Sequence, residues 1–169
     1  MMQKAPNRTL IILILGALST ISPFAIDMYL PAFPGIADAL GTTTAKISLS
    51  IASYFVGLAI GQVIYGPLLD RFGRKPPLYG GLILFIVASL MCLRVHTVEE
   101  LIALRFLQAF GGCVAQVASM AMVRDFFPVQ ETAKILSLLI LILGVSPLLA
   151  PSVGSFIALH ASWHWVFVV

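Results

Sequence analysis

Long apolar segments alternate with short polar connections along the whole chain. The apolar runs cover residues 9–29, 45–66, 78–93, 101–123 and 135–159, and one more begins at Trp163. About 20 helical residues cross a hydrocarbon core of ~30 Å, so the five long runs predict five transmembrane helices. Residues 163–169 are too few to cross it. We therefore expect residues 1–169 to form an all-α integral membrane bundle that stops inside its sixth helix.

Composition supports a lipid environment for this chain. Of its 169 residues, 60% are hydrophobic and only 10% are charged, whereas soluble domains carry about 25% charged residues. So few charges cannot cover the surface of a globule in water, which excludes a soluble fold. The two cysteines fall in or near apolar runs and indicate neither a metal site nor a disulfide framework.

The cations lie mainly between the apolar runs, which indicates membrane topology. If the spans alternate, two cations, Lys46 and Arg94, fall on one side of the membrane, and Arg105 lies inside a span. Seven fall on the other side: Lys4, Arg8, Arg71, Arg74, Lys75, Arg124 and Lys134. This bias predicts a multi-pass membrane protein whose amino terminus and whose connections 67–77 and 124–134 are cytoplasmic. A scattered net charge of +3 does not indicate nucleic-acid binding.

Motifs typical of enzymes are absent from the sequence. It has no phosphate-binding glycine loop, no cluster of histidine, cysteine and carboxylate at metal spacing, and no serine elbow. We therefore expect a protein that is not an enzyme and that uses no cofactor or metal. The ionisable residues within the apolar runs are the candidates for function, because such residues mark functional sites in membrane proteins.

Two ionisable residues lie at matched depth within separate apolar runs. Asp27 is near the outer end of the first run, and Arg105 is near the outer end of the fourth, so the two are candidate partners facing the bundle interior. Gln108 lies one helical turn from Arg105 on the same face. The alternative is that Asp27 ends its helix at the headgroups before Pro31 while Arg105 reaches the same interface.

A charged connection over residues 66–77 joins the second and third runs with almost no slack. Gly73 suits a left-handed turn, and we expect Pro76 and Pro77 to keep the next helix from starting early. Asp70 stands near the carboxyl end of a helix, where its charge requires a cation or the amino terminus of another helix. The candidate site in this connection comprises Gly66, Asp70, Arg71, Gly73, Arg74 and Lys75.

This connection resembles the Gly-x-x-x-Asp-Arg-x-Gly-Arg-Lys signature of the major facilitator superfamily. The stretch 27–34 is similar to the end of the first helix in the Bcr/CflA subfamily of drug:proton antiporters. Two further stretches, Arg124-Asp125 and 162–165, also resemble sequences of that subfamily. The stretch 105–111 resembles the family's fourth-helix signature, with Ala109 in place of a glycine. The resemblance implies the amino-terminal six-helix half of a twelve-helix fold, in which Asp70 closes against helices of the other half.

The fifth run combines two prolines with a stripe of small residues. Pro147 and Pro151 remove backbone donors and predict a bend near the middle of this helix. Ser146, Ala150 and Gly154 recur every four residues and permit close helix contact, which we expect to be with helices beyond this chain. The segment 150–155 resembles the family's antiporter signature with two glycines replaced. Packing alone is the alternative explanation for this segment.

The resemblance implies proton-coupled multidrug efflux across the bacterial inner membrane by alternating access, driven by the proton gradient. The implied partners are the lipid bilayer, an amphipathic drug, protons and the carboxyl-terminal helices. Asp27, Arg105 and Gln108 are the candidates for proton coupling, and the charged connection is the candidate cytoplasmic latch. Two alternatives stay open: a major-facilitator transporter of another small molecule, or a truncated bundle that does not transport.

Overall fold

The computed structural model describes residues 8–160 and 162–168, and Lys4 and Val169 lie outside this range. Every regular element within the described residues is helical. The elements are α1 (Arg8–Asp27), the 3₁₀ helix η1 (Leu30–Ala32), α2 (Phe33–Ala39), α3 (Thr44–Phe72), α4 (Lys75–Cys92), α5 (Val98–Phe126), α6 (Val129–His160) and the 3₁₀ helix η2 (Trp163–Phe167).

Five helical segments are long and apolar enough to cross a membrane. They are Arg8–Ala39, Thr44–Phe72, Lys75–Cys92, Val98–Phe126 and Val129–His160. The first segment combines α1, η1 and α2. The all-α integral membrane fold predicted from the apolar runs is confirmed, and the helices extend several residues beyond most of the predicted spans.

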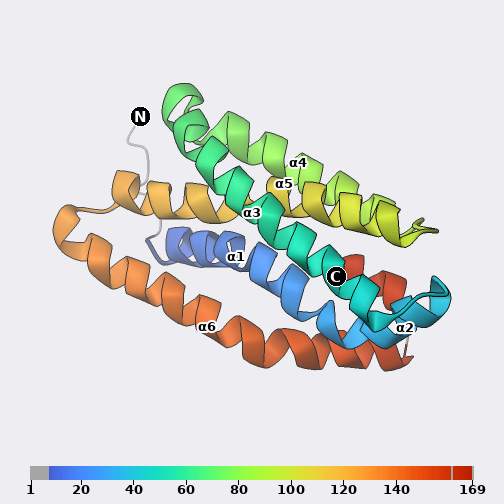
Figure 1. The fold of residues 1–169 in the computed structure, drawn as a ribbon. Helices are drawn as coiled ribbons and strands as arrows, with labels where there is room; N and C mark the ends of the chain where they lie inside the picture. Colours follow the sequence, from blue (N-terminus) through green and yellow to red (C-terminus); the bar gives the residue numbers. More distant parts are fainter. Residues whose placement is uncertain (1–7, 161, 169) are drawn as a thin grey trace.

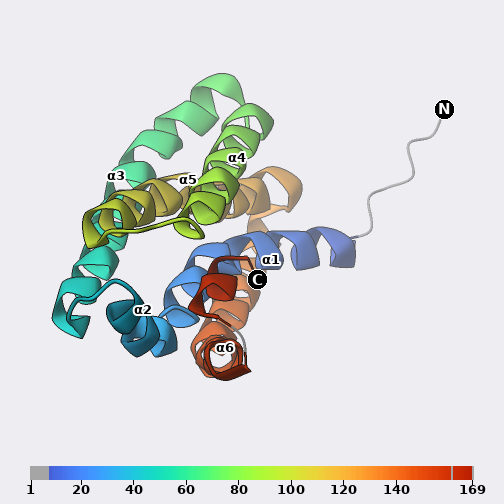
Figure 2. The ribbon, with the colours of Figure 1, turned by 90° about the vertical axis from the view of Figure 1, so that its right-hand side faces the viewer.

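The long helices run side by side (Figure 1). Viewed along the bundle, α5 lies between the pair α3 and α4 and the pair α1 and α6 (Figure 2). Over half of its apolar window, 56%, is buried, against 22–33% for the other four segments. Helix α5 is therefore the core of the bundle, and polar side chains on it are held away from lipid.

Small residues allow α5 to approach its neighbours closely. A Cβ atom on Gly57 of α3 would lie 2.5 Å from the carbonyl oxygen of Phe106, and one on Gly111 of α5 would lie 2.6 Å from the carbonyl oxygen of Gly81 on α4. Neither space admits a side chain, so these glycines set the helix spacing. The register of α3, α4 and α5 is fixed by this packing.

The first membrane segment is interrupted directly after Asp27. Helix α1 ends there, and the chain continues through η1 and α2 to Ala39, with Pro31 and Pro34 in the first turns of those two short helices. Asp27 is the last of the 20 residues of α1, within an apolar segment of 32 residues. This position favours an intramembrane carboxylate over one that ends the segment at the headgroups.

The turn between α3 and α4 consists of only Gly73 and Arg74. Gly73 has φ of +79°, as predicted for a left-handed turn position. The expectation that Pro76 and Pro77 delay the next helix is wrong, because α4 begins at Lys75 and carries both prolines in its first turn. A first-turn proline lacks only an amide hydrogen that has no helical partner there.

Helix α6 contains both Pro147 and Pro151 and changes direction near its middle (Figure 1), as predicted from the two prolines. The small residues of its stripe, Ser146, Ala150 and Gly154, are all buried. A Cβ atom on Gly154 would collide with the backbone of Met28. The stripe therefore packs against the end of α1 within this chain, and the expectation that it contacts helices beyond the chain is wrong.

Candidate functional site

Arg105 is the largest fully buried side chain in the described bundle. Its Nη1 donates to Oε1 of Gln108 over 2.7 Å, and its Nη2 donates to the backbone carbonyl of Ala25 over 3.1 Å. The first bond confirms the predicted contact between Arg105 and Gln108. The second ties α5 to α1 one turn before the interruption that follows Asp27.

Two tyrosine rings enclose the guanidinium of Arg105. Its Cζ lies 4.3 Å from the ring centroids of both Tyr29 and Tyr54, and Phe167 lies beyond at 5.9 Å. Cation–π contacts are worth about 2 kcal/mol or more when they are desolvated. The aromatic rings thus supply much of the stabilisation that a buried cation otherwise obtains from a carboxylate.

The predicted pairing of Asp27 with Arg105 is not formed. Among the described residues, no carboxylate oxygen lies within 4.0 Å of the Arg105 guanidinium. The reason is geometric: the backbone carbonyl of Ala25 and the rings of Tyr29 and Tyr54 already occupy the surroundings of the cation. Asp27 and Arg105 were predicted to lie at the same depth in the membrane, but equal depth does not make their side chains point toward each other from α1 and α5.

A polar network extends from Arg105 across the bundle core. Nε2 of Gln108 donates to Oγ of Ser89 on α4 over 2.7 Å, so the amide links α5 to a third helix. The hydroxyl of Tyr29 bonds Oγ of Ser50 on α3 at 2.7 Å. Four of the membrane segments, those of α1, α3, α4 and α5, meet in this network, which is buried except where it borders a cavity.

Asp27 lies on a different side of α1, against α6. Its Oδ2 accepts a long hydrogen bond, 3.5 Å, from the hydroxyl of Ser146. The carboxylate is partly exposed and forms no ion pair within the described residues. It stands where the interruption of α1 meets the residue before Pro147. A carboxylate with one weak partner and access from outside the bundle is able to exchange a proton.

The charged turn between α3 and α4 forms a separate cluster of charged side chains. Arg74 donates from Nη1 to Asp70 over 3.0 Å and from Nε to Asp125 on α5 over 2.7 Å, and Nη2 adds a longer bond to Asp125. The bond to Asp125, more than that to Asp70, holds the pKa of Arg74 above its usual value. Arg74 thus fastens the α3–α4 turn to the end of α5.

The other candidates in this turn differ in what they contact. Asp70 obtains its cation from Arg74 within the chain, so no helix of another half is needed to supply one. Arg71 lies over the ring of Phe72, and Lys75 is exposed. A Cβ atom on Gly66 would meet nothing within 4 Å. Only Asp70 and Arg74 of the predicted set are therefore joined directly.

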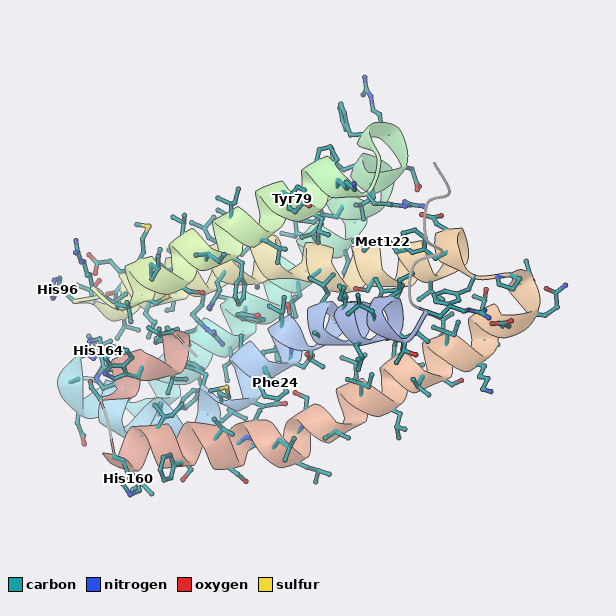
Figure 3. The ribbon with its side chains drawn as sticks, turned by 180° about the vertical axis from the view of Figure 1, so that it is seen from behind. Phe24, Tyr79, His96, Met122, His160 and His164 are labelled. Carbon is teal, nitrogen blue, oxygen red and sulfur yellow. The ribbon has the colours of Figure 1, made fainter. Side chains whose placement is uncertain are left out.

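A cavity of about 480 Å³ lies between α1, α4 and η2. Its lining is mainly apolar and includes Phe24, which Figure 3 labels on α1. Ser89 and Gln108 also reach it, so the polar network around Arg105 borders this space. The volume falls in the range of small-molecule pockets, about 300–1,000 Å³.

The histidines lie far from the charged turn. Figure 3 shows His96, His160 and His164 at one end of the bundle, and the labelled Met122 lies toward the other end. Within residues 8–160 and 162–168, no three histidine, cysteine or carboxylate side chains gather at distances that suit a metal ion.

The sequence matches the family model described as Major Facilitator Superfamily over residues 15–169. The chain belongs to the major facilitator superfamily. This match covers nearly the whole chain and agrees with the five long apolar helices and with the signature in the charged turn. The family predicted from that signature is confirmed.

Curated relatives in the superfamily include proteins named for drug resistance. The chain is 42% identical over 165 residues to the uncharacterized MFS-type transporter YdgK of Bacillus subtilis, which is 96% of this chain and 41% of the relative. It is 36% identical over 168 residues to a bicyclomycin resistance protein homolog of Haemophilus influenzae, covering 99% of this chain and 42% of the relative. It is 37% identical over 151 residues to the multidrug resistance protein MdtL of Klebsiella pneumoniae, covering 89% and 38%. The chain thus spans about two fifths of the length of these relatives.

Three residues that contact the predicted site residues were not predicted from the sequence. Tyr29 and Tyr54 enclose Arg105, and Asp125 binds Arg74. A weak signal exists for the tyrosines, because a tyrosine within an apolar run brings a polar atom that requires a partner. The only sequence feature that pointed to Asp125 was its place in the motif with Arg124. Its contact with Arg74 could not be predicted, because the two residues are 51 positions apart.

Proposed function

We propose that this chain supplies the amino-terminal part of a proton-coupled multidrug exporter of the bacterial inner membrane. The exporter works by alternating access and uses the proton gradient, with no cofactor and no catalysed reaction. The observation that carries the proposal is the separation of the two intramembrane charges. Arg105 is enclosed within the core, whereas Asp27 is partly exposed and has only a weak partner.

Asp27 is the proposed proton carrier. Ionisable residues within membrane segments are costly and mark ion pathways. The Asp27 carboxylate lies where α1 is interrupted and where the bent helix α6 crosses it, so a change in its charge acts on both irregular helices. Protonation removes the cost of a charge in this setting and favours closer packing of the two helices.

Arg105 and Gln108 serve proton coupling by positioning in this proposal. Arg105 holds the last turn of α1 through the carbonyl of Ala25, and Gln108 holds Arg105 in turn. The fixed cation also makes the surrounding core unfavourable for a second cation. A proton entering from the outer side is thereby directed to the carboxylate of Asp27, on the other side of α1.

The proposed cargo is an amphipathic, mainly apolar molecule. The cavity between α1, α4 and η2 is lined mainly by apolar side chains, with Thr20, Ser89 and Gln108 as its polar lining residues. Few polar side chains are available to bind a sugar or an amino acid. The relatives named for resistance to bicyclomycin and to multiple drugs support the same class of cargo.

The charged turn is the proposed cytoplasmic latch, and the amino terminus is proposed to be cytoplasmic. Asp70, Arg71, Arg74 and Lys75 carry its charges, and Gly66 and Gly73 complete the signature. Arg74 already joins this turn to α5 through Asp125, so the latch moves as one body with α3, α4 and α5 when the two halves of the transporter rock.

The substitution Asp27→Asn tests the proton role in the whole transporter that we propose contains this chain. It keeps the shape and removes the titratable charge. Drug efflux driven by a pH gradient in inverted vesicles should fall to background, while equilibrium drug binding persists. Asp38→Asn is the matched control, because Asp38 is an exposed carboxylate in α2, and its efflux should equal that of the parent. Efflux at the parent rate in the Asp27→Asn protein would contradict the assignment.

A further inference from the structure

A second, smaller groove lies between α3 and α4 near the charged turn. It has a volume of about 350 Å³, and its lining is almost entirely apolar. Tyr65, Leu68 and Phe72 of α3 form one wall, and Pro77, Gly80 and Gly81 of α4 form the other. From Tyr65 to Phe72 the wall is about 10 Å long at 1.5 Å per residue. The groove thus follows α3 for about two helical turns and is open to the outside of the bundle.

The two glycines of the groove have different roles. A Cβ atom on Gly81 would lie 2.8 Å from the carbonyl oxygen of Gly111, so Gly81 serves helix packing. A Cβ atom on Gly80 would meet nothing within 4 Å. Gly80 therefore leaves open space in the groove that no neighbouring helix uses.

Two cations adjoin residues that line the groove, since Arg71 precedes Phe72 and Lys75 precedes Pro76. Arg71 and Lys75 are exposed, and neither forms an ion pair within the described residues. The Arg71 guanidinium lies 5.3 Å from the ring of Phe72, which lines the groove. Asp70 bonds Arg74 and forms no ion pair with either of these two cations. The apolar groove is therefore bordered by two cations without an ion-pair partner among the described residues.

We propose that this groove binds one anionic phospholipid, with an acyl chain along Tyr65, Leu68 and Gly80 and the phosphate between Arg71 and Lys75. An apolar slot fits the chain, and the two cations that border it fit a headgroup with net negative charge. Basic pockets beside membrane helices bind anionic headgroups in this way. The site uses neither Asp27 nor Arg105, but it shares Arg71 and Lys75 with the proposed latch, so its test measures lipid retention by the chain and not efflux.

Lipid retention by the purified 169-residue chain tests the charged part of the site. Native mass spectrometry after extraction from mixed vesicles should show phosphatidylglycerol bound in preference to phosphatidylcholine and phosphatidylethanolamine. The double variant Arg71→Gln/Lys75→Gln should lose this preference by about tenfold or more. Lys46→Gln/Lys134→Gln removes the same charge from exposed positions elsewhere and should keep it. Equal retention of the three lipids by the parent would overturn the proposal.

Filling the groove tests its apolar part. Gly80→Leu places a side chain in the open space, and Gly144→Leu makes the same change on α6, where a Cβ atom also meets nothing within 4 Å. Only Gly80→Leu should reduce phosphatidylglycerol retention. As a second measurement, a photoreactive phenylalanine derivative at Leu68 should cross-link phosphatidylglycerol in intact membranes, and Gly80→Leu should abolish this product. Unchanged retention and cross-linking in Gly80→Leu would refute the acyl-chain site.

Discussion

The carboxylate of Asp27 lies 3.5 Å from the hydroxyl of Ser146 and accepts its hydrogen bond. This contact joins the last residue of α1 to the residue before Pro147 in α6. Both helices are irregular at this level, one through an interruption and the other through prolines. Because irregular backbone is tolerated in membranes only where protein or a cavity covers it, we infer that the two helices cover each other's irregular backbone at the level of Asp27, whose carboxylate stays partly exposed.

The contact predicts which positions of α6 can be cross-linked to Asp27. With Cys92 and Cys113 replaced by alanine, the pair Asp27→Cys and Ser146→Cys should be joined by a short bifunctional reagent in membranes. The pair Asp27→Cys and Leu148→Cys is the control, since Leu148 is largely exposed on the opposite face of α6. The products are read by mass spectrometry of the digested chain. Preferential linkage to position 148 would mean that α6 is rotated about its axis relative to its orientation in the structure.

Contacts within one helix or one turn could be predicted from the sequence. Arg105 and Gln108 are three residues apart, a spacing that places both on one helical face. The connection that contains Gly73 is very short, and glycine is the residue that adopts a positive φ there most readily. The positive φ of Gly73 could therefore be predicted from the residue type. The five helices followed from the length of the apolar runs.

Contacts between distant helices could not be predicted in the same way. Depth in the membrane is readable from the sequence, but the rotation of each helix is not, because α1 and α5 are apolar on nearly all faces. Asp27 therefore faces α6, while Ala25, two residues earlier, faces Arg105. The partner of the buried cation was predicted as a carboxylate, whereas aromatic rings and a carbonyl take that place.

Because Arg105 is enclosed by specific partners, we predict that another cationic side chain at this position cannot replace the guanidinium. A lysine ammonium cannot bond the carbonyl of Ala25 and the amide of Gln108 in the same fork geometry while stacking on two rings. Arg105→Lys should lower the thermal midpoint of the purified chain, with a loss on the order of 2 kcal/mol for one charge-assisted hydrogen bond. It should also slow drug efflux by the whole transporter. Arg94→Lys, an exposed change in the α4–α5 turn, should alter neither, and a midpoint equal in both variants would speak against the enclosure.

Two glycines of α6 predict opposite effects of the same substitution. Gly154→Ala places a Cβ atom against the backbone of Met28, and backbone cannot move aside as a side chain does. We expect destabilisation of about 1–3 kcal/mol from overpacking. Gly144→Ala meets nothing within 4 Å and should stabilise the helix slightly, by up to about 1 kcal/mol. Thermal unfolding followed by circular dichroism in detergent measures both, and equal midpoints would show that α6 does not pack on α1 through this stripe.

The charge distribution predicts the orientation of the bundle. Reporters active only in the cytosol should function when they are fused after Gly73 or Pro128, at the end rich in arginine and lysine. Reporters active only outside the cytosol should function after Gly41 or His96, in the connections at the opposite end. Activity of the opposite kind at two or more of these sites would reverse the topology, and with it the direction from which a proton reaches Asp27.

The last prediction concerns the 169-residue chain expressed alone. Its five long helices insert and pack around α5, since the contacts of α5 with α1, α3 and α4 are all internal to the chain. Alternating access requires walls from two halves, and the chain spans only about two fifths of the length of its relatives. The isolated chain should therefore be recovered from the membrane fraction as a folded helical protein. It should confer no drug resistance on a susceptible, efflux-deficient host.

The whole transporter is the positive control for this experiment, and its Asp27→Asn variant is the negative one. Resistance from the isolated chain, at a level that Asp27→Asn removes, would contradict the need for a second half. It would then indicate that copies of this chain assemble a cavity between them. Cross-linking of the membrane-bound chain distinguishes that assembly from a monomer, because only an assembly yields products of twice the chain mass or more.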